Sequence, residues 1–76
     1  PLCLSSQNNH FYVTVALLQA GAEINKPMDD GRTPLYVASL KGRLHVVELL
    51  LSAGAAVNQA NNKGATPIWK GGPIEI

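Results

Sequence analysis

The sequence predicts an all-α solenoid, in which short helices are stacked in units of 33 residues. The first observation is a constant displacement: Gly21 and Gly54 are 33 residues apart, and so are Thr33 and Thr66. The second is the overlay of residues 1–36 on 34–69, which gives 13 identities in 36 pairs, where chance would give roughly two or three. A repeat of roughly 20 to 50 residues indicates an array in which each unit contacts only its neighbours.

Length and composition limit the classes of function. A chain of 76 residues is one domain at most, and such chains rarely hold more than about 3–5 kcal/mol of stability without disulfides, metals or partners. A formal charge of +1 with 14% charged residues provides no basic field for nucleic acid or an anionic membrane. The longest apolar run, 46–57, is too short to span a bilayer. The single Cys3 cannot form a disulfide framework, which favours an intracellular location, cytoplasmic or nuclear.

The first repeat is expected to contain two helices. Pro1 lies in the first turn of a helix over 2–8, where its missing N–H costs nothing. Asn9 can end that helix because asparagine tolerates the left-handed conformation. A second helix over about 12–20 carries small and apolar residues at helical spacing, and Gly21 ends it; these residues are Val13, Ala16, Leu17 and Ala20.

A hairpin and the next helix follow. Residues 22–31 are expected to be extended with a tight turn at 29–31, because Asp-Gly between extended arms is a strong hairpin signal. Thr33 caps a helix over 34–41 through its hydroxyl, and Pro34 supplies a pre-set φ at the first helical position. The inner residues of this helix are Leu35, Ala38 and Ser39, and Gly42 ends it.

The helix over about 44–53 is the most hydrophobic segment. It is apolar on more than one face (Val46, Val47, Leu49, Leu50, Leu51), so it must be covered on more than one side, as happens in a stack. Gly54 ends it, a second hairpin turns at 62–64, and residues 66–69 begin a third copy. The pattern then fails because Pro73 cannot lie inside a helix. The last residues are a terminating tail, a divergent cap or a non-native end.

At this point the pattern resembles a known family. Thr-Pro-Leu at 33–35, the Val-x-x-Leu-Leu helix at 47–51 and Gly-Ala-x-x-Asn at 54–58 are similar to the ankyrin repeat. The match is nearly complete over 33–66, looser over 1–32, and limited to the helix start at 67–69. One departure recurs: the family often has His after Thr-Pro-Leu, whereas this chain has Cys3, Tyr36 and Trp69. This departure affects the expected Thr–His hydrogen bond, not the fold.

The resemblance implies an ankyrin-repeat solenoid of antiparallel helix pairs joined by projecting β-hairpin loops. Residues 1–30 would be a repeat lacking its first hairpin, 31–63 a full repeat, and 64–76 the start of a third repeat with a divergent tail. Because Pro1 overlays Pro34, the sequence starts in mid-motif, and we expect a fragment of a longer array. In the family, hairpin tips and first helices line a concave surface that binds other proteins, without catalytic activity.

The residues themselves offer no catalytic, cofactor or metal site. Cys3, His10 and His45 are the only Cys and His residues and lack metal-ligand spacing. Cys3 is expected to be a small buried hydrophobe rather than a nucleophile. No glycine-rich turn is followed by Gly-Lys-Ser/Thr, which excludes a phosphate loop. Asp29 and Asp30 are expected to be solvated turn carboxylates. The sequence therefore predicts no enzyme and no cofactor.

The candidate partner-binding residues lie on the expected concave side. At the hairpin tips they are Asp29, Asp30, Arg32, Asn62, Lys63 and Ala65, and on the first helices Gln7, Asn8, Tyr36, Leu40 and Lys41. Leu40 is the most informative, because an apolar side chain at the rim requires a partner or a neighbouring loop to cover it. Tyr36 either exposes part of its ring beside Leu40 or packs in the core, and the hairpin charges are either partner contacts or merely solvated.

Two functions remain open. The first is a protein-interaction module that uses the concave face. The alternative is a structural spacer or regulatory segment of a larger enzyme or channel, which contacts flanking repeats or other parts of its own chain. Apolar residues at both ends of the stack support the alternative, since we expect them to be exposed in isolation: Leu2, Cys3, Leu4, Ile68 and Trp69. With fewer than three complete units, end-to-end self-association is also expected.

Overall fold

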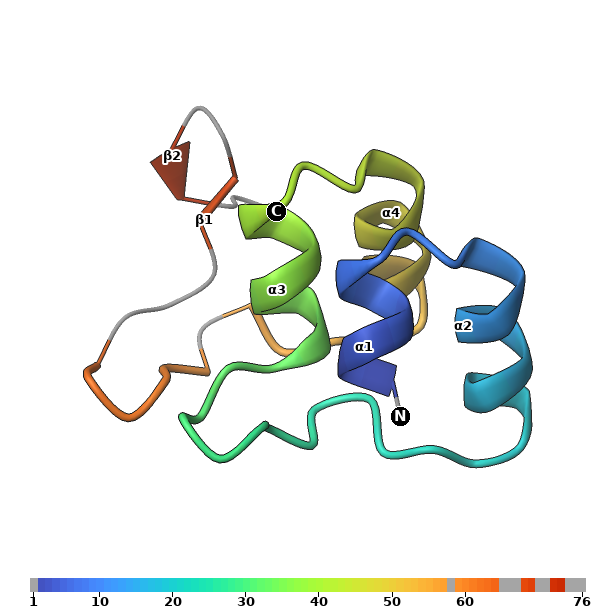
Figure 1. Ribbon diagram of the computed structural model, residues 1–76, viewed down its shortest axis with the longest axis horizontal. Coiled ribbons are helices and arrows are strands. Elements are labelled where there is room, and N and C mark those ends of the chain that lie inside the picture. Colours follow the sequence, from blue (N-terminus) through green and yellow to red (C-terminus); the bar gives the residue numbers. More distant parts are fainter. Residues whose placement is uncertain (1, 58, 65–67, 70–71, 74–76) are drawn as a thin grey trace.

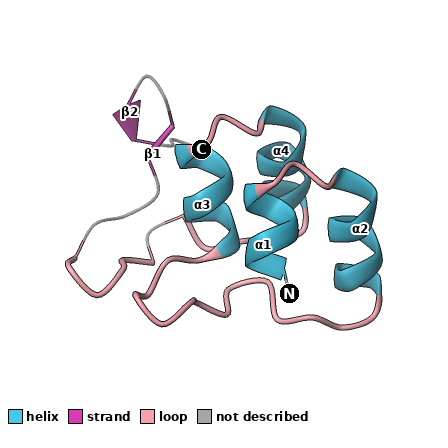
Figure 2. Ribbon diagram, in the orientation of Figure 1, coloured by secondary structure: helices cyan, strands magenta, loops and turns pink. Residues whose placement is uncertain are grey.

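The structure, a computed structural model, contains two helix pairs packed side by side (Figure 1). It describes residues 2–57, 59–64, 68–69 and 72–73. Within these ranges the elements are α1 (Leu2–Gln7), α2 (Phe11–Gln19), α3 (Pro34–Leu40), α4 (Leu44–Ser52), β1 (Ile68–Trp69) and β2 (Gly72–Pro73). The helices of each pair are antiparallel, whereas α1 packs on α3 and α2 on α4 in parallel. Helices and long connecting loops make up most of the chain (Figure 2), and the predicted helical stack is confirmed.

Left-handed residues end the helices where the repeat predicts them. Asn9 has φ 61° and its counterpart Gly42 has φ 71°, so both form the bend between the two helices of a pair. Gly21 and Gly54, at φ 91° and 92°, follow α2 and α4. Glycine adopts this region of φ without strain and asparagine tolerates it, whereas most other residues are strained there. The four positions therefore explain why the chain reverses at the same place in each repeat.

The start of α3 follows the expected capping mechanism. The Thr33 hydroxyl accepts a hydrogen bond from the Tyr36 N–H at 3.2 Å, and Pro34 occupies the first helical position. This bond satisfies one of the N–H groups left free at a helix start. The Thr–backbone half of the capping arrangement is thus present although Tyr36 replaces the family's histidine.

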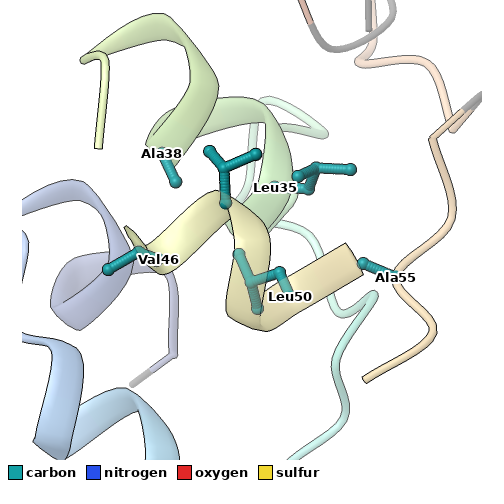
Figure 3. Close-up of a cluster of buried hydrophobic side chains, with 6 residues drawn as sticks. Leu35, Ala38, Val46, Leu50 and Ala55 are labelled. Carbon is teal, nitrogen blue, oxygen red and sulfur yellow. The ribbon is translucent and has the colours of Figure 1, made fainter. Parts of the chain in front are cut away.

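The core lies in the second repeat and is completed by the first. Its buried apolar residues come from α3, α4 and the turn after α4: Leu35, Ala38, Val46, Val47, Leu50 and Ala55 (Figure 3). Phe11, Leu18 and Ile24 of the first repeat pack against this cluster and remain partly buried. A single apolar seam therefore joins the two repeats, which is the arrangement expected of stacked units.

The predicted inner stripe of α2 requires correction. Val13, Ala16 and Ala20 are exposed and Leu17 is only half-buried. The residues of α2 that face the core are instead Phe11, Leu18 and Thr14. The Thr14 hydroxyl can be buried at little cost because it lies 2.9 Å from the Ser5 hydroxyl and donates to the His10 carbonyl at 2.8 Å. The second repeat covers one face of α2, and the predicted stripe lies on another.

The expected exposure is only partly correct at the N-terminal end of the stack, and it is untested for Ile68 and Trp69, whose side chains lie outside the description. Leu4 is exposed as expected, but Leu2 and Cys3 are buried. The reason is that the loop after α2 passes beneath α1, so that the Cys3 thiol donates to the Arg32 and Lys26 carbonyls at 3.6 and 3.7 Å.

The start of the third repeat does not form the expected helix where the structure describes it. Residues 68–69 form β1 and pair antiparallel with 72–73, and β1 packs beside α3. The prolyl ring of Pro73 excludes a helix there, as the sequence indicated. Thr66 and Pro67, which were expected to open that helix, lie outside the described residues.

Candidate functional site

The two loop tips project from the same end of the helix pairs (Figure 1). In the first, the Gly31 N–H donates to the Met28 carbonyl at 2.8 Å and the Met28 N–H to the Arg32 carbonyl at 2.9 Å. In the second, the Gly64 N–H donates to the Asn61 carbonyl at 3.0 Å. Both tips are tight turns with a left-handed glycine, which agrees with the Asp-Gly and Lys-Gly signals.

Hydrogen bonds join the two tips to each other. The backbone N–H of Asn62 donates to the Asp30 carbonyl at 2.9 Å, and its side-chain amide donates to the Asp29 carbonyl at 2.8 Å. The backbones approach so closely that a Cβ on Gly31 would lie 2.6 Å from the backbone N of Asn62 and 2.9 Å from the carbonyl carbon of Asn61. The predicted tip residues Asp29, Asp30, Asn62 and Lys63 therefore form one continuous ledge, and Lys63 is exposed on it.

The charges of the first tip are partly paired. Arg32 Nε contacts Asp30 Oδ2 at 2.6 Å, and the Arg32 N–H donates to Asp30 Oδ1 at 3.0 Å. These bonds, first the one from the backbone N–H and then those from the guanidinium, lower the pKa of Asp30 below its ordinary value. An exposed pair of this kind contributes little stability. Its effect is to hold the Arg32 side chain against the turn.

Tyr36 connects the ledge to the inner helices. It is half-buried, and its hydroxyl accepts from the Asn61 side-chain amide at 3.4 Å. Cys3, its counterpart in the first repeat, makes an analogous contact with the loop beneath it. Both side chains therefore link an inner helix to a following loop, and only part of the Tyr36 ring remains for a partner.

The other predicted residues lie at the far end of the inner helices, opposite the ledge (Figure 1). Leu40 is 53% exposed, and Lys41 and Asn8 are exposed. Gln7 is half-buried, and its carbonyl accepts from Arg43 Nε at 2.9 Å. The structure thus divides the predicted surface into a polar ledge and a rim, in which Leu40 is an exposed apolar side chain among the polar residues Gln7, Asn8 and Lys41. Ala65 lies outside the described residues.

Sequence reasoning did not identify a hollow at the first repeat. This hollow has a volume of about 570 Å³ and is lined by Leu2, Cys3, Gly21, Ala22, Glu23, Lys26, Pro27 and Met28. Its signal in the sequence was Ala22, whose counterpart Ala55 is buried in the apolar cluster of the second repeat. Within the described ranges, no cluster of three His, Cys, Asp or Glu residues is placed to hold a metal, and no helix has the length and apolar character needed to cross a membrane.

Cys3 should react slowly in the native protein. Burial raises the pKa of its thiol above 9.0, and the thiolate is the reactive form. We expect iodoacetamide to label the folded chain roughly tenfold or more slowly than the same chain in urea.

The raised pKa of Cys3 also makes the stability of the fold depend on pH. The stability that comes from burying the neutral thiol is complete below pH 9.0 and is lost as the pH rises through the native pKa. The free energy of unfolding, measured by urea titration, should therefore fall less between pH 7 and pH 10 for Cys3→Ala than for the wild type. Equal labelling rates for the folded chain and the chain in urea would contradict the burial of Cys3.

Comparison with known proteins identifies the family. The family model for ankyrin repeats, in three copies, matches residues 1–70. A search of curated proteins finds no match to the chain. Ankyrin repeats generally mediate protein–protein interaction and are typically non-enzymatic. With its 33-residue period, its capped inner helices and its paired loop tips, the chain belongs to the ankyrin-repeat family.

Proposed function

We propose that the chain binds another protein through the ledge and the rim on the concave side of the stack. The observation that carries this proposal is Leu40, an apolar side chain that is 53% exposed at the end of an inner helix. Exposed apolar groups framed by polar ones are typical of interaction sites. Lys41 beside it and Lys63 on the ledge are both exposed, and they suit a partner with an acidic segment.

The ledge supports the proposal because it is held in one geometry before a partner arrives. Asn62 joins both tips, and Tyr36 anchors the second tip to α3 through Asn61. A surface that is already ordered loses less conformational entropy when it binds. In this arrangement Leu40 supplies the apolar contact, and Asp29, Asp30, Arg32 and Lys63 orient the partner.

The test compares two equally exposed leucines. The chain is immobilised on a support and incubated with extract from the cells that express it, and the retained proteins are quantified by mass spectrometry. We expect Leu40→Glu combined with Arg32→Ala to weaken retention roughly tenfold or more, because the apolar anchor and an orienting charge are both lost. The control is Leu44→Glu, since Leu44 is 51% exposed but lies on the outer helix α4. Retention that survives the double change, or that is lost only in the control, would assign binding to another face.

A further inference from the structure

The peptide bond between Asp30 and Gly31 has features that favour its rearrangement through a succinimide. Gly31 has no Cβ to shield its backbone nitrogen. The Asp30 side chain is 51% exposed, so water reaches it. Its Oδ1 accepts from the Arg32 N–H at 3.0 Å, and this bond closes a ring of atoms that contains both the Asp30 carboxyl carbon and the Gly31 nitrogen. One short turn therefore holds an electrophile and a nucleophile together.

Other contacts of the native turn oppose the reaction. The Gly31 N–H donates to the Met28 carbonyl at 2.8 Å, and Gly31 is covered by Asn62 of the second tip. The Arg32 guanidinium contacts Asp30 Oδ2 at 2.6 Å and stabilises the ionised carboxylate. The Arg32 backbone N–H and its guanidinium accordingly lower the pKa of Asp30. Reaction therefore starts from a local opening of the tip, which leaves the helices folded.

We propose that Asp30 is a site of spontaneous isoaspartate formation in the folded chain and that Arg32 restrains its rate. The Gly31 nitrogen bonds to the carboxyl carbon of protonated Asp30, and the carboxyl OH leaves with the N–H proton as water. The product is a cyclic succinimide. Water then adds to the former main-chain carbonyl carbon of Asp30 and breaks its bond to Gly31, which gives isoaspartate. Addition at the other carbonyl regenerates aspartate.

The isoaspartyl chain cannot keep the contact between the two tips. The main chain becomes one carbon atom longer, and the Asp30 carbonyl that accepts from the Asn62 N–H at 2.9 Å becomes part of a free α-carboxylate outside it. The tip has no room for the extra length, since even a Cβ on Gly31 would lie 2.6 Å from the Asn62 backbone N. Rearrangement therefore separates the tips and dismantles the ledge. This chemistry does not depend on the proposed partner binding.

Ageing the folded chain at 37 °C and pH 6 tests the proposal. Peptide mapping separates isoaspartyl from aspartyl peptides, which have the same mass, and electron-transfer fragmentation identifies the residue. Isoaspartate should accumulate at Asp30 roughly tenfold or more faster than at Asp29, because the residue after Asp29 carries a Cβ. A folded chain that forms none at Asp30, while the same chain in urea does, would overturn the proposal.

Arg32→Ala tests the restraint, because it keeps the backbone bond to Oδ1 and removes only the guanidinium. We expect isoaspartate to form roughly two- to fivefold faster in the folded variant, as the loss of an exposed ion pair implies. In urea, where the pair is absent, variant and wild type should react at equal rates. An unchanged folded rate, or an acceleration of the same size in urea, would overturn the role of Arg32.

Two control variants exclude other causes of acceleration. Lys26→Ala removes an exposed cation from the same loop, whereas the ion pair of Asp30 is with Arg32, so the folded rate should not change. Leu17→Ala weakens the packing of α2 rather than the tip and should also keep the wild-type rate. Acceleration in Lys26→Ala would contradict a specific pair, and acceleration in Leu17→Ala would place the reaction in the unfolded chain.

Hydrogen exchange of the aged protein measures the effect on the ledge. The isoaspartyl form is isolated by ion-exchange chromatography and compared with the unmodified chain. The Asn62 amide should exchange roughly tenfold or more faster in the isoaspartyl form, because its acceptor is displaced. The Ala55 amide, which donates to the Leu50 carbonyl at 2.9 Å, should exchange as before. Equal exchange of the Asn62 amide in both forms would show that the tips stay joined and would overturn this consequence.

Discussion

Gly31→Ala is expected to remove most of the free energy of unfolding of the protein. Two costs combine at this position. The φ of 85° is unfavourable for a residue with a Cβ by roughly 1–2 kcal/mol. The new methyl would also lie 2.5 Å from Asn62 Oδ1 and 2.6 Å from its backbone N, and overpacking of this kind costs roughly 1–3 kcal/mol. A total of about 3 kcal/mol approaches the whole stability of a chain of this size. Urea titration followed by circular dichroism measures the loss.

Gly64→Ala separates the two costs. Gly64 is the counterpart of Gly31 at the second tip, with φ 83°, but its added Cβ would meet nothing within 4 Å. We expect this control to lose only the conformational part, about 1 kcal/mol. Equal losses for the two variants would show that the contact between the tips does not restrict Gly31.

Leu50→Ala is expected to be comparably damaging, by about 2–5 kcal/mol. Leu50 is fully buried and belongs to the apolar cluster that α3, α4 and the following turn form (Figure 3). Its truncation leaves a cavity that the closely packed surrounding side chains fill only in part. The midpoint of thermal or urea unfolding at low protein concentration provides the measurement.

Leu17→Ala is the matched control for Leu50→Ala. Leu17 occupies the same position in the first repeat but is only half-buried. Its truncation removes less buried area and leaves no closed cavity, so a loss of about 1 kcal/mol is expected. A loss as large as that of Leu50→Ala would contradict the difference in burial between Leu17 and Leu50.

Local chemistry and the repeat period predicted the parts of the fold that depend on neighbouring residues. Gly42, Gly54 and Asn9 are left-handed where the overlay places them, and Thr33 caps α3. These features follow from a few adjacent residues. The inner face of α2 was predicted wrongly because periodicity identifies a stripe but not what lies against it. Val13 and Val46 are the same residue in the same motif, and only the neighbouring repeat distinguishes them.

The candidate site shows the same division. The tips were recognisable from Asp-Gly and Lys-Gly, and the exposure of Leu40 follows from its place in the unit. The bonds from Asn62 to Asp29 and Asp30 join residues about one repeat apart, and no local pattern encodes them. The hollow beneath α1 was missed because it forms between a helix and a loop that meet only in the folded chain. The partner-binding role of the predicted residues remains a prediction.

The uneven placement of the core sets an order of assembly. Every residue of the buried apolar cluster belongs to α3, α4 or the turn that follows α4, so these helices can condense on contacts that are close in the sequence. The first repeat is polar at the equivalent centre, where Ser5 and Thr14 share a hydrogen bond in place of Ala38 and Val47. Such a pair gains little until a neighbouring surface excludes water. We therefore expect the folding nucleus to form in the second repeat and α1 and α2 to dock onto it late, so that the chain becomes ordered from α3 and α4 towards α1.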